Sequence, residues 1–284
     1  MAAYTRPEQR AAKAGGARNK SAARTNLTSD TVRVHTSNEL GRGNFRIAYA
    51  GTYIGGNRNT QAAACKKFKQ QFSHMATEYF RQDFRIAEKA IEYADQWNQI
   101  CPRSKEILVT KGTVHRVGGE KYLVEPEIRD FTKFTSNSGW IDHNKGGAGL
   151  ALEAFAHYTY HRSGGSMLVC DLQGRYRANQ GKRTRFELTD PAICSRQRSY
   201  GPTDLGEKGI ETFFARHCCN QFCNKGGRWQ RPRDPSEWFE SSSGTSMFSS
   251  SLDRHLGLRS TTRFTLNYES IMECDEEDSD VDDW

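Results

Sequence analysis

The stretch His217-Cys-Cys-Asn-Gln-Phe-Cys223 is the strongest local signal in this chain, because it brings histidine and cysteine together at short spacing. Cys219 and Cys223 are four residues apart, which would place both thiols on one face of a helix. His217 lies only two residues before Cys219, so we expect the helix to begin or distort there. Thiolate sulfur and imidazole nitrogen are ligands that zinc prefers in proteins. The stretch therefore predicts a zinc site.

Cys194 is the residue that we expect to complete this site, giving three cysteines and one histidine. Four protein ligands leave no open position for water, so this zinc would stabilise the fold and take no part in chemistry. Cys218, within the same stretch, is the competing ligand. The other four of the eight cysteines are predicted to be bystanders: Cys65, Cys101, Cys170 and Cys274.

The N-terminus has no apolar leader, and no window approaches the ~20 apolar residues that a membrane helix needs. We therefore expect a soluble, intracellular protein, cytoplasmic or nuclear, with no membrane partner. Cysteines in such a compartment stay reduced, which favours metal binding over disulfides for those that cluster.

Charge is unevenly distributed along the chain, whose formal net charge is +7 at pH 7. Residues 1–30 form a basic arm with almost nothing large to bury, and we expect this arm to be disordered. Residues 229–284 are expected to be a flexible tail, first Ser-rich and then acidic. The folded domain is therefore assigned to residues 31–228, and its positive surplus suits partners that carry phosphate.

Two lobes of α+β structure are expected in this domain. The first, about residues 31–130, combines an antiparallel meander with an amphipathic helix from His74 to Asn98, where apolar residues recur every three and four positions. Short runs rich in β-favouring residues predict its strands: Val32–His35, Phe45–Tyr49, Ala62–Phe68, Ile107–Val109, Thr113–Val117 and Tyr122–Ile128.

The second lobe, about residues 131–228, is predicted to contain a helix from Gly149 to Arg162 that ends at paired glycines. The short apolar run Met167–Cys170 predicts a buried strand. The basic segment Arg175–Arg185 is expected to be an exposed hairpin, and a last helix should start beyond Gly206.

Asp171 and Gln173 follow the buried strand at a spacing of two, so their side chains point the same way. Asp190, before Pro191, supplies a second carboxylate that can meet them. These oxygens suit Mg²⁺, and an aspartate can also orient or deprotonate a hydroxyl. Polar residues at strand ends are common, so a solvated strand end is the alternative.

Four residues of the first lobe and the linker after it have the character of nucleotide ligands. Arg46 closes a glycine-containing loop in which backbone N–H groups can approach phosphate, and Lys66 lies on a strand of the same sheet. Glu125 ends the last strand of that sheet, and Lys133 follows where it can pair with Glu125 or with phosphate. Individually, each also fits an ordinary hairpin loop, strand end or solvated lysine.

Seven short motifs follow one another in a distinctive order: Ala64–Phe68, Phe131–Gly139, Ala154–Gly165, Val169–Gly174, Leu188–Pro191, Gly201–Gly206 and His217–Cys223. Because these motifs follow one another in this order, the sequence resembles the alpha-kinase family of atypical protein kinases over roughly residues 31–225. The His-Arg-Asp and Asp-Phe-Gly signatures of conventional protein kinases are missing. The resemblance implies a two-lobed kinase fold with structural zinc in the C-terminal lobe. It also implies transfer of the γ-phosphate of ATP to Ser or Thr of a protein substrate.

The resemblance implies roles for the candidate residues in binding ATP. Lys66 and Arg46 would hold phosphates, and Lys66 would be needed for catalysis. Glu125 would mark the hinge that binds adenine, with Lys133 close to the nucleotide. The family commonly has histidine at the position of Cys194, for which sulfur is an acceptable replacement as a zinc ligand.

The resemblance also implies the catalytic roles. Asp171 would orient or deprotonate the substrate hydroxyl, while Gln173 and Asp190 would coordinate Mg²⁺. Phosphoryl transfer depends mainly on positioning and charge neutralisation, so these few groups suffice chemically.

Two other functions stay open. The chain could be a catalytically inactive kinase-like scaffold, or a zinc-stabilised nucleic-acid-binding protein that uses its basic arm and residues 175–185. Asp171 and Asp190 count against nucleic acid, because carboxylates in a phosphate-binding groove repel phosphate unless a metal bridges them.

The serine-rich part of the tail, Ser241–Ser246 and Ser249–Ser251, is tethered to the predicted catalytic unit. Since tethering raises effective concentration, we expect autophosphorylation in this region.

Overall fold

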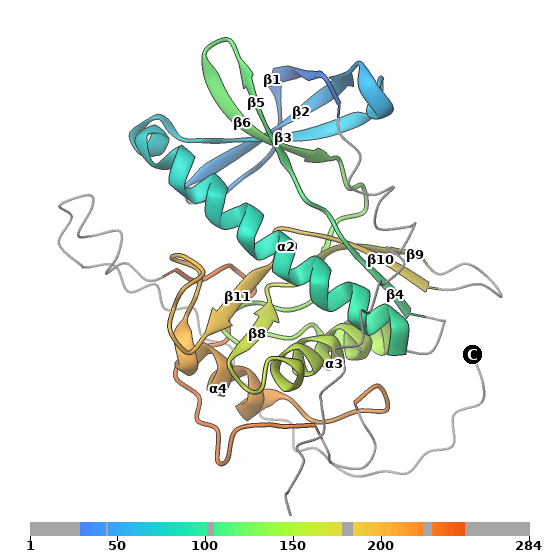
Figure 1. Ribbon diagram of the computed structural model, residues 1–284, viewed down its shortest axis with the longest axis vertical. Coiled ribbons are helices and arrows are strands. Elements are labelled where there is room, and N and C mark those ends of the chain that lie inside the picture. Colours follow the sequence, from blue (N-terminus) through green and yellow to red (C-terminus); the bar gives the residue numbers. More distant parts are fainter. Residues whose placement is uncertain (1–28, 44, 101–104, 178–183, 224–228, 248–284) are drawn as a thin grey trace, which may run out of the picture.

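The computed structural model describes residues 29–43, 45–100, 105–177, 184–223 and 229–247. Its first lobe is an antiparallel sheet with the strand order β1-β2-β3-β6-β5 (Figure 1). The strands are β1 (Thr31–Arg42), β2 (Arg46–Ile54), β3 (Ala62–Phe68), β5 (Thr113–Val117) and β6 (Glu120–Pro126). The predicted meander is confirmed, with Arg46 opposite Phe68 at one end of the β2–β3 ladder. Period-two alternation buries Ala63 and Cys65 on one face of β3.

A long helix, α2 (Ala76–Ile100), runs from the first lobe into the second (Figure 1). The 3₁₀ turn η2 (Gln70–Met75) leads into it, and a shorter turn, η1 (Gly56–Arg58), lies between β2 and β3. Phe80 packs in a cluster with residues of the first lobe, whereas Trp97 is buried in the large core of the second. The predicted amphipathic helix is therefore confirmed, and it belongs to both lobes.

A second sheet has the order β4-β10-β9-β7, formed by β4 (Lys105–Val109), β10 (Thr184–Thr189), β9 (Gln173–Arg177) and β7 (Thr132–Lys133). We expected the strand at Ile107–Val109 to belong to the first lobe, which is wrong, because β4 pairs in parallel with β10. All three residues of this run are buried, so the strand needs cover on both faces. Asn98 of α2 fixes its position by hydrogen bonding both backbone groups of Ile107, at 2.8 and 2.7 Å.

Helix α3 (Gly146–Arg162) is the centre of the second lobe, and every residue from Ala151 to Tyr160 is buried. A helix buried on all sides needs apolar residues all round, which its sequence supplies apart from a few polar groups. The turn η3 (His143–Lys145) precedes it. The predicted strand β8 (Met167–Cys170) pairs with β11 (Ala192–Ser195), and α4 (Gly206–Arg216) packs on β11.

Residues 229–247, which we name the C-terminal strap, return across the second lobe. We expected a flexible tail from residue 229, which is wrong for this part. Trp229 packs against the core, with its ring centroid 6.4 Å from that of Trp97. Arg216 forms an ion pair with Glu237 at 2.7 Å. Aromatic side chains with apolar surface to bury hold the strap against the domain.

Several predictions fall outside the described residues: the basic arm up to residue 28, the segment 178–183 within the basic hairpin, and the tail from residue 248, including Ser249–Ser251. Within the part of the chain that the structure describes, no helix combines the length and apolar composition of a membrane span.

Gly174 on β9 lies very close to the neighbouring strand of the second sheet, and its φ is 145°. An added Cβ would overlap the carbonyl oxygen of Glu187 and lie 2.9 Å from Cα of Leu188 on the neighbouring strand. We therefore expect Gly174→Ala to lower the free energy of unfolding by more than about 2 kcal/mol. Gly147→Ala is the matched control, because a Cβ there meets nothing within 4 Å, and it should change stability by less than about 1 kcal/mol. Urea denaturation measures both, and equal effects would contradict this account of the sheet.

Candidate active site

An ion cluster between the lobes centres on the amine of Lys66. Its Nζ lies 2.5 Å from Oε2 of Glu125 on β6 and also donates to Oδ2 of Asp190, which follows β10. The β3–β6 register pairs Ala64 with Glu125, so the long side chain of Lys66 reaches its partner diagonally. Thr189 donates its hydroxyl to the same oxygen of Glu125 at 2.6 Å. Residues from both lobes therefore meet at one ammonium group.

The charges of this cluster shift the pKa of each member. Burial raises the pKa of Glu125, although Lys66 opposes the change. Burial alone would raise the pKa of Asp190, but the nearby ammonium of Lys66 outweighs burial and lowers that pKa. Burial acts to lower the pKa of Lys66, and the two carboxylates outweigh it and raise that pKa. The carboxylates of Glu125 and Asp190 thus share the single positive charge of Lys66. A second cation could offset the negative charge that remains.

Arg46, predicted to hold phosphate, forms an ion pair with Asp83 of α2 at 2.7 Å. Its guanidinium lies 4.6 Å above the ring of Phe68, so aromatic packing also fixes its position. Burial raises the pKa of Asp83, and Arg46 opposes the change. Asp83 was not predicted as a site residue, because a carboxylate in an amphipathic helix usually faces solvent. The phosphate-binding role of Arg46 stays a prediction.

Asp171 directly follows β8, and only 3% of its side chain is exposed. Lys133 places Nζ 2.7 Å from Oδ1 of Asp171. We expected Lys133 to pair with Glu125 or phosphate, and as regards Glu125 this is wrong. Because β7 pairs with β9, Lys133 lies opposite Gln173, two residues from Asp171. Burial raises the pKa of Asp171, and Lys133 opposes the change.

Both candidate catalytic aspartates have left-handed backbone conformations, with φ at 56° for Asp171 and 47° for Asp190. This conformation costs a residue with a Cβ roughly 1–2 kcal/mol, although the short polar side chain of Asp tolerates it better than most. Each aspartate stands where a strand ends, so the turn redirects its carboxylate out of the strand line. Backbone strain of this kind is concentrated at functional sites.

Gln173 on β9 lies between the two groups of charges, opposite both Lys133 and Thr189. Its Nε2 donates to the backbone oxygen of Asp190 at 3.1 Å, so its amide oxygen is the atom that can serve a cation. Asp190 is also close enough to raise the pKa of Asp171. Six predicted residues are therefore brought to one region: Lys66, Glu125, Lys133, Asp171, Gln173 and Asp190.

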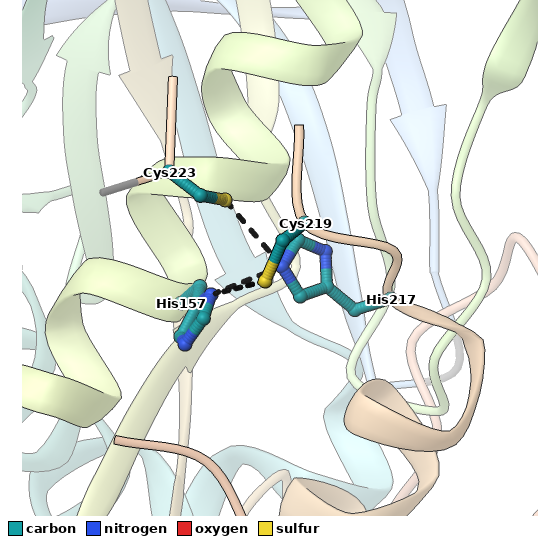
Figure 2. A group of neighbouring side chains, drawn as sticks. All are labelled: His157, His217, Cys219 and Cys223. Atoms are coloured by element: carbon teal, nitrogen blue, oxygen red, sulfur yellow. Dashed lines mark hydrogen bonds between the residues drawn. The ribbon is translucent and has the colours of Figure 1, made fainter. Parts of the chain in front are cut away.

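A second cluster lies in the core of the C-terminal lobe, where one donor atom from each of four residues is within 4.8 Å of the others (Figure 2). They are His157, His217, Cys219 and Cys223. Nδ1 of His157 lies 3.1 Å from Nε2 of His217 and 3.7 Å from Sγ of Cys219. Sγ of Cys223 lies 3.6 Å from Nε2 of His217. Two nitrogens and two sulfurs form a donor set suited to zinc.

The outer nitrogens of both imidazoles contact acceptors. Nδ1 of His217 lies 2.5 Å from Oε1 of Glu153, and Nε2 of His157 lies 3.2 Å from the backbone oxygen of Gln230. Assigning the ring protons to these outer contacts leaves a lone pair on each inner nitrogen. Two lone pairs 3.1 Å apart repel unless a proton or cation lies between them, and outward hydrogen bonds are typical of metal-binding histidines.

Cys194 lies outside this cluster, so its predicted place as fourth ligand is wrong. It is fully buried on β11, with Sγ 3.7 Å from Sγ of Cys170 and 3.8 Å from the backbone oxygen of Asn137. A Cβ added to Gly209 would lie only 2.6 Å from Sγ of Cys194, which shows how closely α4 covers this thiol. Cys194 is a packing residue between β11 and α4.

The backbone around the other ligands also differs from the expectation. Helix α4 ends at Arg216, so Cys219 and Cys223 do not lie on one helical face. A turn brings them together instead, with the amide of Cys223 bonded to the oxygen of Asn220 at 2.9 Å. Cys218 is disulfide-bonded, contrary to the expectation that the cysteines are reduced.

His157 is a ligand candidate that was not predicted from the sequence, although a signal was present. Glu153 and His157 are four residues apart in a helix that is otherwise apolar over this part, so they share one buried face. A polar pair inside a buried helix needs partners, and here it finds them in the loop after α4.

Removing the ammonium from the interlobe cluster should destabilise the protein, because Glu125 would then be buried without its cation. We expect Lys66→Met to lower the free energy of unfolding by about 3 kcal/mol. The double variant Lys66→Met/Glu125→Gln should recover part of this loss, since no uncompensated buried charge remains at that position. Urea denaturation at neutral pH gives both values. Additive losses in the double variant would show that the two side chains do not interact.

Comparison with known proteins places this geometry in a family. A sequence model of the alpha-kinase family matches residues 41–223. The alpha-protein kinase vwkA of Dictyostelium discoideum is 30% identical over 206 residues, which are 67% of this chain and 30% of that protein. Eukaryotic elongation factor 2 kinase of Caenorhabditis elegans is 32% identical over 146 residues, which are 50% of this chain and 17% of that protein. The chain thus spans less than a third of the length of these curated relatives.

Solved structures show the same fold. An alpha kinase from Entamoeba histolytica superimposes with a TM-score of 0.60 at 24% identity, over 76% of this chain and 85% of that one. The alpha-kinase domain of myosin-II heavy chain kinase A, in complex with AMP-PNP, gives 0.56 at 22% identity, over 68% of this chain and 85% of that one. The family match covers more than half of the chain and includes both clusters, so this protein belongs to the alpha-kinase family.

Proposed function

We propose that this protein is a serine/threonine protein kinase that uses ATP and Mg²⁺. The observation that carries the proposal is the buried carboxylate of Asp171, held by Lys133 next to the cluster of Lys66, Glu125 and Asp190. A carboxylate able to take a proton and cations able to neutralise phosphate are thus gathered in one region. Phosphoryl transfer needs these two elements. Relatives whose names identify them as protein kinases support the same reaction.

Each residue has a distinct part in this reaction. Asp171 accepts the proton of the substrate hydroxyl, and Lys133 orients its carboxylate and favours the ionised form of it. Lys66 and Arg46 neutralise phosphate oxygens, which requires them to share or exchange their present carboxylate partners. The carboxylate of Glu125 is occupied by Lys66 and Thr189, so its side chain orients Lys66, and adenine would contact the backbone at this strand end.

Gln173 and Asp190 are the residues proposed to hold Mg²⁺. The amide oxygen of Gln173 and the partly exposed carboxylate of Asp190 are hard oxygen donors, and the net negative charge of the ion cluster suits a divalent cation. When bound, Mg²⁺ would neutralise charge on the phosphates of ATP.

Neither alternative function explains the same residues as well. A nucleic-acid-binding groove would gain nothing from Asp171 and Asp190, which repel phosphate without a metal. An inactive scaffold has no need for the buried carboxylate of Asp171 held by Lys133, beside a lysine that is shared by two further carboxylates.

Phosphate transfer from labelled ATP to a generic basic protein, with Mg²⁺ present, tests the proposal. We expect Asp171→Asn to lower kcat by at least about 100-fold, because the proton acceptor is lost while the shape is kept. Asp130→Asn is the matched control, since Asp130 is also left-handed, with φ at 56°, but is exposed. It should leave kcat unchanged. Equal activity of both variants, or no transfer by the unaltered protein, would contradict the kinase proposal.

We also propose a structural zinc ion bound by His157, His217, Cys219 and Cys223. The inward lone pairs of the two imidazoles and the two neighbouring thiols support this ligand set. With four protein ligands the ion has no position for substrate. It would join α3 to the loop after α4, and Glu153 would orient His217 from outside.

Zinc content separates this ligand set from the one that includes Cys194. We expect one zinc per chain in the unaltered protein, loss of zinc in His157→Ala and full zinc in Cys194→Ala. Both variants remove a buried side chain, so each is a packing control for the other. Native mass spectrometry with elemental analysis measures the metal. Full zinc in His157→Ala, or loss from Cys194→Ala, would show that the ligand set is wrong.

A further inference from the structure

The C-terminal strap brings a hydroxyl group to the candidate catalytic aspartate. Oγ1 of Thr245 donates a hydrogen bond to Oδ2 of Asp171 at 2.7 Å. Nζ of Lys133, which binds the other carboxylate oxygen, donates to the same threonine hydroxyl at 3.2 Å. A general base must lie within about 2.6–3.2 Å of the atom whose proton it takes. Thr245 meets this requirement without any movement.

The strap is fastened on both sides of this contact. After Thr245, the side chain of Asn137 forms two bonds with the backbone of Ser246, donating to its oxygen at 2.7 Å and accepting from its nitrogen at 2.8 Å. Before Thr245, the hydroxyl of Ser138 donates to the backbone oxygen of Ser242 at 3.3 Å. Asn137 and Ser138 are buried, so the strap is bound by fixed groups of the second lobe.

Further contacts hold the beginning of the strap. Arg216, the last residue of α4, pairs with Glu237 and also donates to the backbone oxygen of Phe239 at 3.2 Å. The amide of Trp238 donates to the hydroxyl of Thr212 on α4 at 3.0 Å. A short chain thus joins a well-anchored point to Thr245, which gives the hydroxyl a high effective concentration at Asp171.

We propose that Thr245 is a phosphoacceptor that the kinase modifies within its own chain, an inference that rests on the proposed function. In this step a bond forms between Oγ1 of Thr245 and the γ-phosphorus of ATP. The bond from that phosphorus to the oxygen bridging the β-phosphate breaks, and its electron pair leaves with ADP. The hydroxyl proton passes to Asp171. Lys133 stabilises the developing negative charge on the threonine oxygen.

Thr245 differs from the serines around it in this respect. Ser241, Ser242 and Ser243 are exposed, whereas Thr245 is partly buried against Asp171 and Lys133. The structure thus narrows the expected autophosphorylation of a serine-rich region to one hydroxyl. While Thr245 occupies the carboxylate of Asp171, a protein substrate must displace it in order to reach the same oxygen.

Autophosphorylation of the purified full chain with ATP and Mg²⁺ tests the inference, followed by intact mass and phosphopeptide mapping. We expect phosphate on Thr245, and a first-order rate constant that stays unchanged over an about 100-fold dilution of the protein, because the reaction is intramolecular. Thr245→Val should lose this phosphate, and Thr245→Ser should carry it on the new serine. Ser243→Ala is the matched control and should behave like the unaltered protein.

The same samples are assayed on a generic basic protein, so that the two proposals can fail separately. Transfer to the basic protein with no phosphate on residue 245 overturns the inference and leaves the kinase proposal intact. A rate constant that falls in proportion to protein concentration also overturns it, because the acceptor would then belong to another molecule. No transfer to either acceptor overturns both proposals.

Discussion

The ammonium of Lys66 is the group on which the arrangement of this site depends. It lies between a carboxylate of the first sheet and one that follows β10 of the second sheet, so one contact both joins the two lobes and places charge in the site. A charge in this environment is stable only when paired, which makes the cluster sensitive to loss of any member. The interlobe position also explains why a nucleotide could engage both lobes at once.

The second lobe is organised around a buried helix whose few polar groups each serve a neighbour. On α3, Glu153 contacts His217 and His157 faces the cysteine-containing loop, so the end of the domain is tied to its centre. The C-terminal strap extends this arrangement. Gln230 contacts His157 near its start, and Thr245 contacts Asp171 near its end, so one segment connects the proposed zinc site with the proposed catalytic site.

Much of this was predictable from sequence, and the failures have physical causes. Periodicity identified α2, a short apolar run identified β8, and the motifs marked Lys66, Asp171 and Asp190, because each of these signals is local in the sequence. The lobe to which β4 belongs depends on a parallel pairing with β10, about eighty residues away, which no local pattern encodes. Cys194 was expected as the fourth ligand because sulfur suits zinc and the family commonly has histidine at that position, whereas the direction of its side chain is decided by packing against α4. The strap looked like a tail because its anchoring aromatics are sparse among polar residues.

The Lys66 cluster is proposed to be a magnesium-dependent phosphate site whose charges are paired within the protein until nucleotide binds. Titration calorimetry with a non-hydrolysable ATP analogue, in buffers with and without added Mg²⁺, tests it most directly. The account predicts that Mg²⁺ tightens binding to the unaltered protein by at least about 10-fold, which corresponds to about 1.4 kcal/mol, and that Asp190→Asn removes most of this gain. Equal affinity with and without Mg²⁺ in the unaltered protein would contradict it.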